Sequence, residues 1–314
     1  MGGAARGPHG MSDASLVSRD RARPKGAQSG FAGEVEALKR QVETRLGQLL
    51  PAGGEPSLAA RHSLLAPAKR LRAVLTLLAA RQCAGAGWRD EDALDVACAV
   101  EMIHTASLIF DDLPAMDDAE TRRGAPTPHT LYGEDVAILA GIGLLNGAFG
   151  VVAGAPLAPS QRVEVVEVMS RAVGWTGLVQ GQALDLKQGD AALDDIHYGK
   201  TGALFVAAAL AGAACADAGV AARGPLTVYG RELGLAYQAL DDVLDVVASP
   251  EAAGKTTGRD DGMRTAADGS LAAGRAKAAG HLEAARVAAD RACDGSPLAA
   301  LVAYIEGHFQ RIAG

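Results

Sequence analysis

Residues 107–118 read SLIFDDLPAMDD, an apolar run that leads into two aspartates, a proline and two further aspartates. A helix that ends here places Asp111 and Asp112 where its macrodipole already carries partial negative charge, so both carboxylates are doubly disfavoured. A positive group must offset them. The stretch therefore predicts a long apolar helix that ends in an acidic, cation-binding site.

A second acidic stretch, YQALDDVLDV at residues 237–246, repeats the pattern. Asp241 and Asp245 are four residues apart, so both leave one face of a helix about one turn apart. Carboxylates that share a cation with phosphate oxygens are typical of Mg²⁺ sites. Two solvated acidic turns are the alternative interpretation of either stretch alone. An EF-hand is excluded, because neither stretch has its loop spacing.

Basic residues decide between these interpretations. A lone Lys or Arg is usually a solvated surface group, but here several accompany the two acidic stretches. The aspartates could bind a metal ion, and the Lys and Arg side chains could bind phosphate groups. Together they indicate an enzyme that binds diphosphates. The basic groups, with one neighbouring threonine, are Lys69, Arg70, Arg72, Arg122, Arg123, Lys200, Thr201 and Lys255.

Composition favours an all-α fold. The 314-residue chain is 49% hydrophobic but only 4% aromatic, and the β-branched alternation typical of strands is scarce. The net charge is −7 without a sustained basic stripe, which argues against nucleic acid as a partner. Glycine, proline and aspartate separate the expected helices, which cover residues 31–50, 70–83, 92–112, 130–150, 160–185, 195–217, 223–248, 270–292 and 297–312.

Two segments bear on domain organisation and location. Residues 1–30 lack an apolar core and predict a disordered leader rather than a signal peptide, which leaves 31–314 as a single all-helical domain. Residues 136–161 carry no charge and could span a bilayer of about 30 Å, but they lack basic flanks and aromatic anchors. We expect a helix buried on all sides, no membrane span and, since no CxxC pair occurs, a reduced cytoplasmic protein.

With these motifs in order, the chain resembles the trans-isoprenyl diphosphate synthases, which extend allylic diphosphates with isopentenyl diphosphate. The resemblance runs from about residue 60 to 265. Within the family, the segments LLAPAKRLR, HTASLIFDDLPAMDDAETRRGAPTPH and GLVQGQALDL are most similar to bacterial geranylgeranyl diphosphate synthases of carotenoid pathways. The resemblance implies the isoprenoid synthase fold, about ten core helices around a deep central cavity, and a homodimer.

The resemblance also implies roles for individual residues. Three Mg²⁺ ions, which Mn²⁺ could replace, would be bound by Asp111, Asp117 and Asp241. Asp112 and Asp245 would support these ligands, and Asp242 and Lys200 would be further catalytic residues. The allylic diphosphate, of five to fifteen carbons, would contact Arg122, Lys200, Thr201, Gln238 and Lys255. Isopentenyl diphosphate would contact Lys69, Arg72, His104 and Arg123. A lone His104 on an apolar helix would otherwise be taken as a core histidine.

Four positions depart from the family pattern. Ala68 replaces the usual glycine before Lys69, and Ala73 replaces the proline that often follows KRLR. Thr256 stands where an aspartate is expected after Lys255, and Met263 where a second lysine is usual, although Arg264 lies beside it. The last change weakens the case for full closure of that loop over a diphosphate.

Product length should follow cavity depth. Ser107 and Ala106 precede Asp111 by four and five residues, roughly 6–7.5 Å along a helix. Aromatic side chains there would form a shallow floor, as in family members that stop at fifteen carbons, so these small residues favour a C20 product, geranylgeranyl diphosphate. The alternatives are a farnesyl (C15) diphosphate synthase, a class I terpene cyclase and a non-catalytic partner subunit.

Overall fold

The structure is a computed structural model that describes residues 25–187, 192–247, 271–292 and 297–313. Within these residues it is helical apart from one two-stranded hairpin, which confirms the predicted all-α class. The elements, in chain order, are α1 (Lys25–Leu49), α2 (Glu55–Leu64), α3 (Leu71–Cys83), α4 (Glu91–Asp111), β1 (Thr121–Arg122), β2 (Ala125–Pro126), α5 (Pro128–Tyr132), α6 (Glu134–Gly154), α7 (Pro159–Val173), α8 (Leu178–Lys187), α9 (Leu193–His197), the π-helix η1 (Tyr198–Gly202), α10 (Ala203–Cys215), α11 (Val220–Val247), α13 (Leu271–Ala292) and α14 (Pro297–Ala313).

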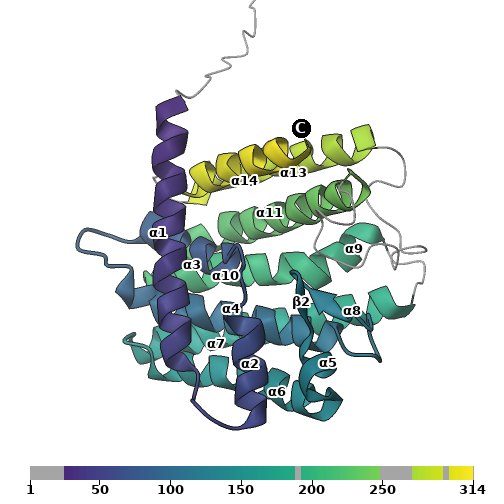
Figure 1. The fold of residues 1–314 in the computed structure, drawn as a ribbon. Helices are drawn as coiled ribbons and strands as arrows, with labels where there is room; N and C mark the ends of the chain where they lie inside the picture. Colours follow the sequence, from purple (N-terminus) through teal and green to yellow (C-terminus); the bar gives the residue numbers. More distant parts are fainter. Residues whose placement is uncertain (1–24, 188–191, 248–270, 293–296, 314) are drawn as a thin grey trace, which may run out of the picture.

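The helices stack in layers (Figure 1). α13 and α14 lie above α11, α10 lies with α3 and α4 in the middle, α6 and α7 form the lower side, and α1 stands upright along one flank. The middle layer is the core, because twelve of the thirteen residues of α10 and eleven of the thirteen of α3 are buried. Helix α10 contacts both α4 and α11, the helices on which the two aspartate stretches lie.

Two helices that the sequence predicted as continuous are divided. Residues 160–185 fold as α7 and α8, with a turn between them in which a Cβ added to Gly177 would meet the carbonyl of Ala172. Residues 195–217 fold as α9, η1 and α10. The sequence analysis also missed α2 and the hairpin β1–β2, whose register pairs Thr121 with Pro126.

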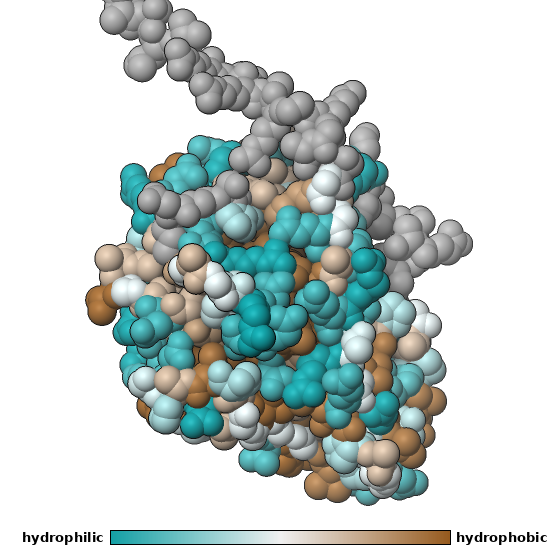
Figure 2. All heavy atoms as spheres, turned by 90° about the vertical axis from the view of Figure 1, so that its left-hand side faces the viewer, coloured by the Kyte–Doolittle hydropathy of each residue, from teal (hydrophilic) through white to brown (hydrophobic). Residues whose placement is uncertain are grey.

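The prediction that the uncharged stretch at 136–161 forms a helix buried on all sides is wrong. In α6, Ile138, Leu139 and Ile142 are 39%, 54% and 51% exposed, and this helix therefore presents an open apolar face. By length and composition alone, three helices, at Glu91–Asp111, Glu134–Gly154 and Leu193–Cys215, could cross a membrane. In the other two, most of the apolar window is buried inside the protein. Figure 2 shows hydrophobic residues gathered in the lower part of the flank view, below a largely hydrophilic area.

Several predicted features lie at or beyond the edge of the described residues. α1 begins at Lys25, inside the stretch predicted as a leader, while residues 1–24 lie outside the described part. Lys255, Thr256, Met263 and Arg264 also lie outside it, as does the side chain of Asp245.

Candidate active site

The loop after α4 folds back so that the first aspartate stretch forms one cluster. The backbone N–H of Asp117 donates to the carbonyl of Asp111 at 2.8 Å, and the N–H of Ala119 donates to the carbonyl of Asp112 at 3.1 Å. These bonds satisfy carbonyls at the C-terminal end of α4 that have no partner within the helix. The same bonds hold Asp111 and Asp117, both half-buried, next to each other.

Asp112 is 2% exposed. Its Oδ1 accepts a 2.6 Å hydrogen bond from Nε of Arg122, the last residue of β1. Arg123 and Gly124 form the hairpin turn with φ values of 55° and 76°, the left-handed geometry of tight two-residue hairpin loops. Asp112 thus fixes the hairpin that carries both arginines.

The π-helix η1 presents Lys200 and Thr201 between α8 and α11. Gly199 contacts Gly181 of α8, and a Cβ added to Gly234 of α11 would lie 2.6 Å from Cα of Gly202. Only residues without side chains permit such close backbone approach. Lys200 consequently forms an ion pair with Asp185 of α8, a half-buried carboxylate that the sequence analysis did not single out.

Charges from η1 and α4 meet in this region. Burial raises the pKa of Asp111 to about 6, and neighbouring Asp117 acts in the same direction, while Lys200 and Arg122 oppose it. Burial acts to lower the pKa of Lys200, but Asp185, Asp111 and Asp117 together raise it. The predicted lysine and the first aspartate cluster are therefore within electrostatic reach of one another.

A hydrogen-bonded chain links η1 to the second aspartate stretch on α11. Oγ1 of Thr201 donates to Oε1 of Gln238 at 2.9 Å, and Nε2 of Gln238 donates to Oδ1 of Asp242 at 2.9 Å. Asp242 is 6% exposed and lies 3.8 Å from His197 Nε2. Asp242 is therefore buried in the packing around α11, whereas Asp241 is half-buried. Burial lowers the pKa of Arg72, and Asp241 is among the charges that act against this shift.

Arg72 and His104 come together from α3 and α4, as predicted. Nη1 of Arg72 lies 3.1 Å from Nε2 of His104, and its guanidinium lies 4.7 Å from the ring centroid of Phe205. Burial, with help from Arg72, places the pKa of His104 well below its ordinary value. Because an arginine can only donate, the neutral His104 accepts at Nε2 and carries its proton on Nδ1.

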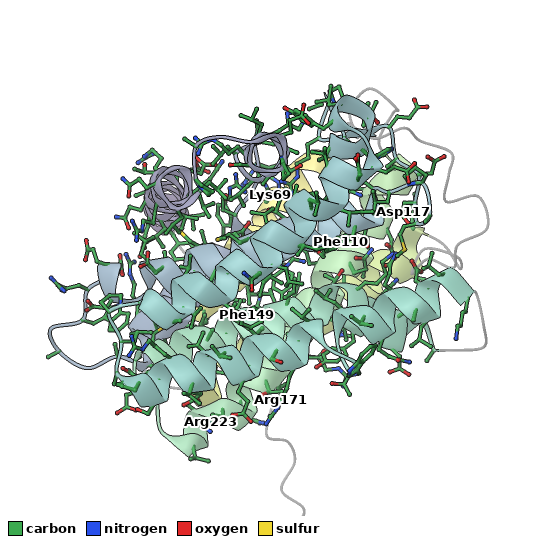
Figure 3. The ribbon with its side chains drawn as sticks, turned by 90° about the horizontal axis from the view of Figure 1, so that it is seen from below. Lys69, Phe110, Asp117, Phe149, Arg171 and Arg223 are labelled. Atoms are coloured by element: carbon green, nitrogen blue, oxygen red, sulfur yellow. The ribbon has the colours of Figure 1, made fainter. Side chains whose placement is uncertain are left out.

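Lys69 is exposed, and its ammonium sits beside two aromatic rings. Nζ donates to the hydroxyl of Tyr237 at 3.2 Å and lies 5.1 Å from the ring centroid of Phe309 in α14. Tyr237 directly precedes Gln238 on α11, so Lys69 is held beside the second aspartate stretch. In Figure 3, Lys69, Phe110 and Asp117 lie in one half of the view and Arg171 and Arg223 in the other.

The residues predicted to limit product length lie on different faces of α4. Ser107 is half-buried, as are His104 and Asp111, which are three residues before it and four after it, so all three share one partly accessible face. Oγ of Ser107 donates to the carbonyl of His104 at 2.9 Å. Ala106 is 1% exposed, so Ser107 is the better placed of the two to meet a bound chain.

The donor set suits a hard cation bound together with a ligand. Among the described residues, three or more His, Cys, Asp or Glu side chains do not converge into a group that could hold a metal ion alone. Asp111 and Asp117 supply carboxylate oxygens at one place, and cationic groups for an anionic ligand surround them. Mg²⁺ is bound in this way, through one or two carboxylates and substrate phosphates.

Comparison with known proteins agrees with this geometry. A family model described as polyprenyl synthetase matches residues 57–266. Geranylgeranyl diphosphate synthase from Pantoea ananas is 45% identical over 241 residues, covering 74% of this chain and 78% of the relative. The crystal structure of geranylgeranyl pyrophosphate synthetase from Pyrococcus horikoshii superposes with a TM-score of 0.78 at 28% identity, covering 92% of this chain and 99% of the other.

A second similar structure contains bound ligands. The geranyltransferase of Helicobacter pylori, complexed with magnesium and isoprenyl diphosphate, superposes with a TM-score of 0.78 at 27% identity over 92% of this chain and all of the other. The predicted isoprenoid synthase fold is thereby confirmed.

Proposed function

Because the chain belongs to the polyprenyl synthetase family, we propose that it condenses isopentenyl diphosphate with allylic diphosphates and releases geranylgeranyl diphosphate. The observation that carries this proposal is that carboxylates able to bind metal lie beside cationic side chains able to bind diphosphate. The aspartate cluster at the end of α4 is faced by Lys200, and the Arg72–His104 pair lies near Asp241 of α11. The reaction requires two adjoining diphosphate sites, one for the allylic diphosphate that ionises and one for isopentenyl diphosphate, whose double bond attacks the cation.

The chain's own residues bind, orient and shield the substrates. Lys200 and Arg122 would hold the allylic diphosphate, while Lys69, Arg72 and Arg123 would hold isopentenyl diphosphate, with His104 keeping Arg72 in place. Asp111, Asp117 and Asp241 would hold Mg²⁺, and this metal supplies charge stabilisation as pyrophosphate leaves. Exclusion of water from the site would protect the allylic cation until the double bond of isopentenyl diphosphate attacks it. Proton loss then completes a chain five carbons longer.

Ser107 supports a C20 product, because a small side chain on the face of α4 that carries Asp111 leaves the growing chain room to extend. The test incubates purified protein with labelled isopentenyl diphosphate, Mg²⁺ and each allylic starter in turn, and then sizes the hydrolysed prenols. A predominant C20 alcohol is expected. A C15 alcohol would support the shorter-chain alternative, cyclic hydrocarbons would indicate a cyclase, and no turnover by the purified chain would point to a partner subunit.

We infer further that the protein is a cytoplasmic homodimer whose subunits meet at the open apolar face of α6. Ile138, Leu139 and Ile142 lie on one side of this helix, and a second copy would remove them from water. Leu139→Glu should halve the mass measured by light scattering. Val220→Glu is the control, because Val220 is 77% exposed at the start of α11. A monomeric mass for the wild-type protein would contradict the homodimer. Recovery of the protein in the membrane fraction would contradict the cytoplasmic location.

A further inference from the structure

Arg70 stands between two residues assigned to the isopentenyl diphosphate site and yet does not face that site. Lys69 before it is exposed, whereas Arg70 is 2% exposed. Its backbone is left-handed, with φ 52° and ψ 30°, at the N-terminal end of α3. This conformation is unfavourable for a non-glycine residue, so contacts elsewhere must hold it in place.

The guanidinium of Arg70 closes the C-terminal end of α2. Nη2 donates to the carbonyl of Leu64 at 2.6 Å and to the carbonyl of Ala66 at 2.9 Å. Leu64 is the last residue of α2, where carbonyls have no partner within the helix and a cation is favoured by the macrodipole. One side chain thus ties both ends of the 64–71 connection together.

Two glutamates on other helices complete the surroundings of this cation. Nε lies 3.6 Å from Glu43 of α1, and Nη1 lies 3.7 Å from Glu101 of α4. Glu101 is 2% exposed, and its other oxygen accepts a 3.2 Å hydrogen bond from the backbone N–H of Ala73 in the first turn of α3. A proline at position 73 could not donate this bond, so the departure to alanine supplies a contact that the usual family residue lacks.

The contacts of Arg70 set the register of α3 against α4. Glu101 precedes His104 by three residues, so the two side chains lie on neighbouring parts of one helix face. Ala73 directly follows Arg72. The contacts of Glu101 with Arg70 and Ala73 therefore lie about one helical turn from the Arg72–His104 pair. They restrict how far α3 can slide or rotate relative to α4.

We propose that Arg70 is a positioning residue for isopentenyl diphosphate: its buried guanidinium fixes the turn that places Lys69 and Arg72 in the diphosphate site. This inference rests on the proposed function. It predicts that Arg70 acts on one of the two substrates, because its contact on α4, Glu101, precedes Asp111 by ten residues, about 15 Å along the helix. Lys200 lies on η1, which none of the contacts described above reaches.

The test compares Arg70→Lys and Arg70→Met with wild type and with Arg61→Met. Arg61 is a matched control on α2, since it also donates to backbone carbonyls, those of Gly47 and Leu50, but lies away from Lys69. KM is measured for each substrate separately, together with kcat, the melting temperature and calorimetric binding of isopentenyl diphosphate. Lysine keeps the charge, but its single Nζ cannot contact two carbonyls and two glutamates, which Arg70 reaches with three different nitrogens.

We expect Arg70→Lys to raise KM for isopentenyl diphosphate at least about tenfold, in line with the large cost of small displacements in a site. KM for the allylic diphosphate should stay unchanged, and Arg61→Met should lower the melting temperature without this selectivity. If Arg70→Met fails to fold, Arg70→Lys decides. Wild-type KM values in Arg70→Lys, or an equal rise for both substrates, would overturn the inference. Absence of any turnover in wild type would instead refute the proposed function.

Discussion

The buried pair of Asp112 and Arg122 allows a quantitative test of how the first aspartate cluster is held. Nε of Arg122 lies 2.6 Å from Oδ1 of Asp112, and the side chains of Asp112 and Arg122 are 3% and 27% exposed. Arg122→Met leaves Asp112 charged and buried without its partner, whereas Asp112→Asn leaves an arginine that water can still reach. The two substitutions should therefore have unequal effects on the free energy of unfolding.

The magnitude follows from the geometry. At an effective dielectric constant of about 20, the Coulomb attraction of charges 2.6 Å apart is about 6 kcal/mol, much of which the cost of desolvating Asp112 offsets. Leaving a buried charge unpaired costs about 3–5 kcal/mol, so we expect Arg122→Met to destabilise the protein by about 3 kcal/mol. Asp112→Asn should cost about 1 kcal/mol, because the amide oxygen can still accept from Arg122 and only the charge assistance of this hydrogen bond is lost.

The assay is a double-mutant cycle by urea denaturation at neutral pH. Wild type, both single variants and the double variant Asp112→Asn/Arg122→Met are followed by circular dichroism. The double variant should be less destabilised than the two single changes added together, with a coupling energy of about 1.5 kcal/mol or more. Additive effects, or a larger loss in Asp112→Asn than in Arg122→Met, would refute the reasoning.

Three further predictions concern packing, product length and catalysis. Gly141→Ala would place a Cβ 2.6 Å from an aromatic ring of α4 and should destabilise by about 1–3 kcal/mol. Gly280→Ala, on an exposed position of α13 with nothing within 4 Å, should instead stabilise by about 0.5–1 kcal/mol in thermal denaturation. Ser107→Phe should shift the sized prenols from C20 towards C15 with turnover retained, and an unchanged distribution would show that this face of α4 does not bound the chain. Asp241→Ala should lower kcat by orders of magnitude, since a metal ligand acts in the transition state. The control is Asp290→Ala, at an exposed position of α13. Equal rates in the two variants would contradict the metal assignment.

Local patterns predicted the parts of the site that lie close together in the chain. The spacing of Asp111 and Asp117 is bridged by one loop, and the pair formed as expected. The Arg72–His104 meeting was predicted only through the resemblance, because α3 and α4 are joined by tertiary packing that spacing does not reveal. Asp185 was missed for the same reason: a single aspartate in α8 gains meaning only when Lys200 lies beside it.

Other differences arise because composition does not distinguish between environments. The glycines and aliphatic residues of α6 suit a buried helix and an exposed subunit contact equally well, so the open face around Leu139 could not be predicted. The π-helix at Tyr198–Gly202 depends on glycine contacts with α8 and α11, which are remote in sequence. Helix α2 was missed because Gly54 and Pro56 at its start suggested only a break in the chain.

The central claim is that the two aspartate stretches form one site because magnesium and a diphosphate lie between them. The most direct measurement is a crystal structure of the protein with Mg²⁺ and a non-hydrolysable allylic diphosphate analogue. We predict metal ions bound by Asp111 and Asp117 on one side and by Asp241 on the other, with the diphosphate contacting Lys200 and Arg122. An analogue bound elsewhere, with these aspartates directed into bulk solvent and no ion beside them, would contradict the account.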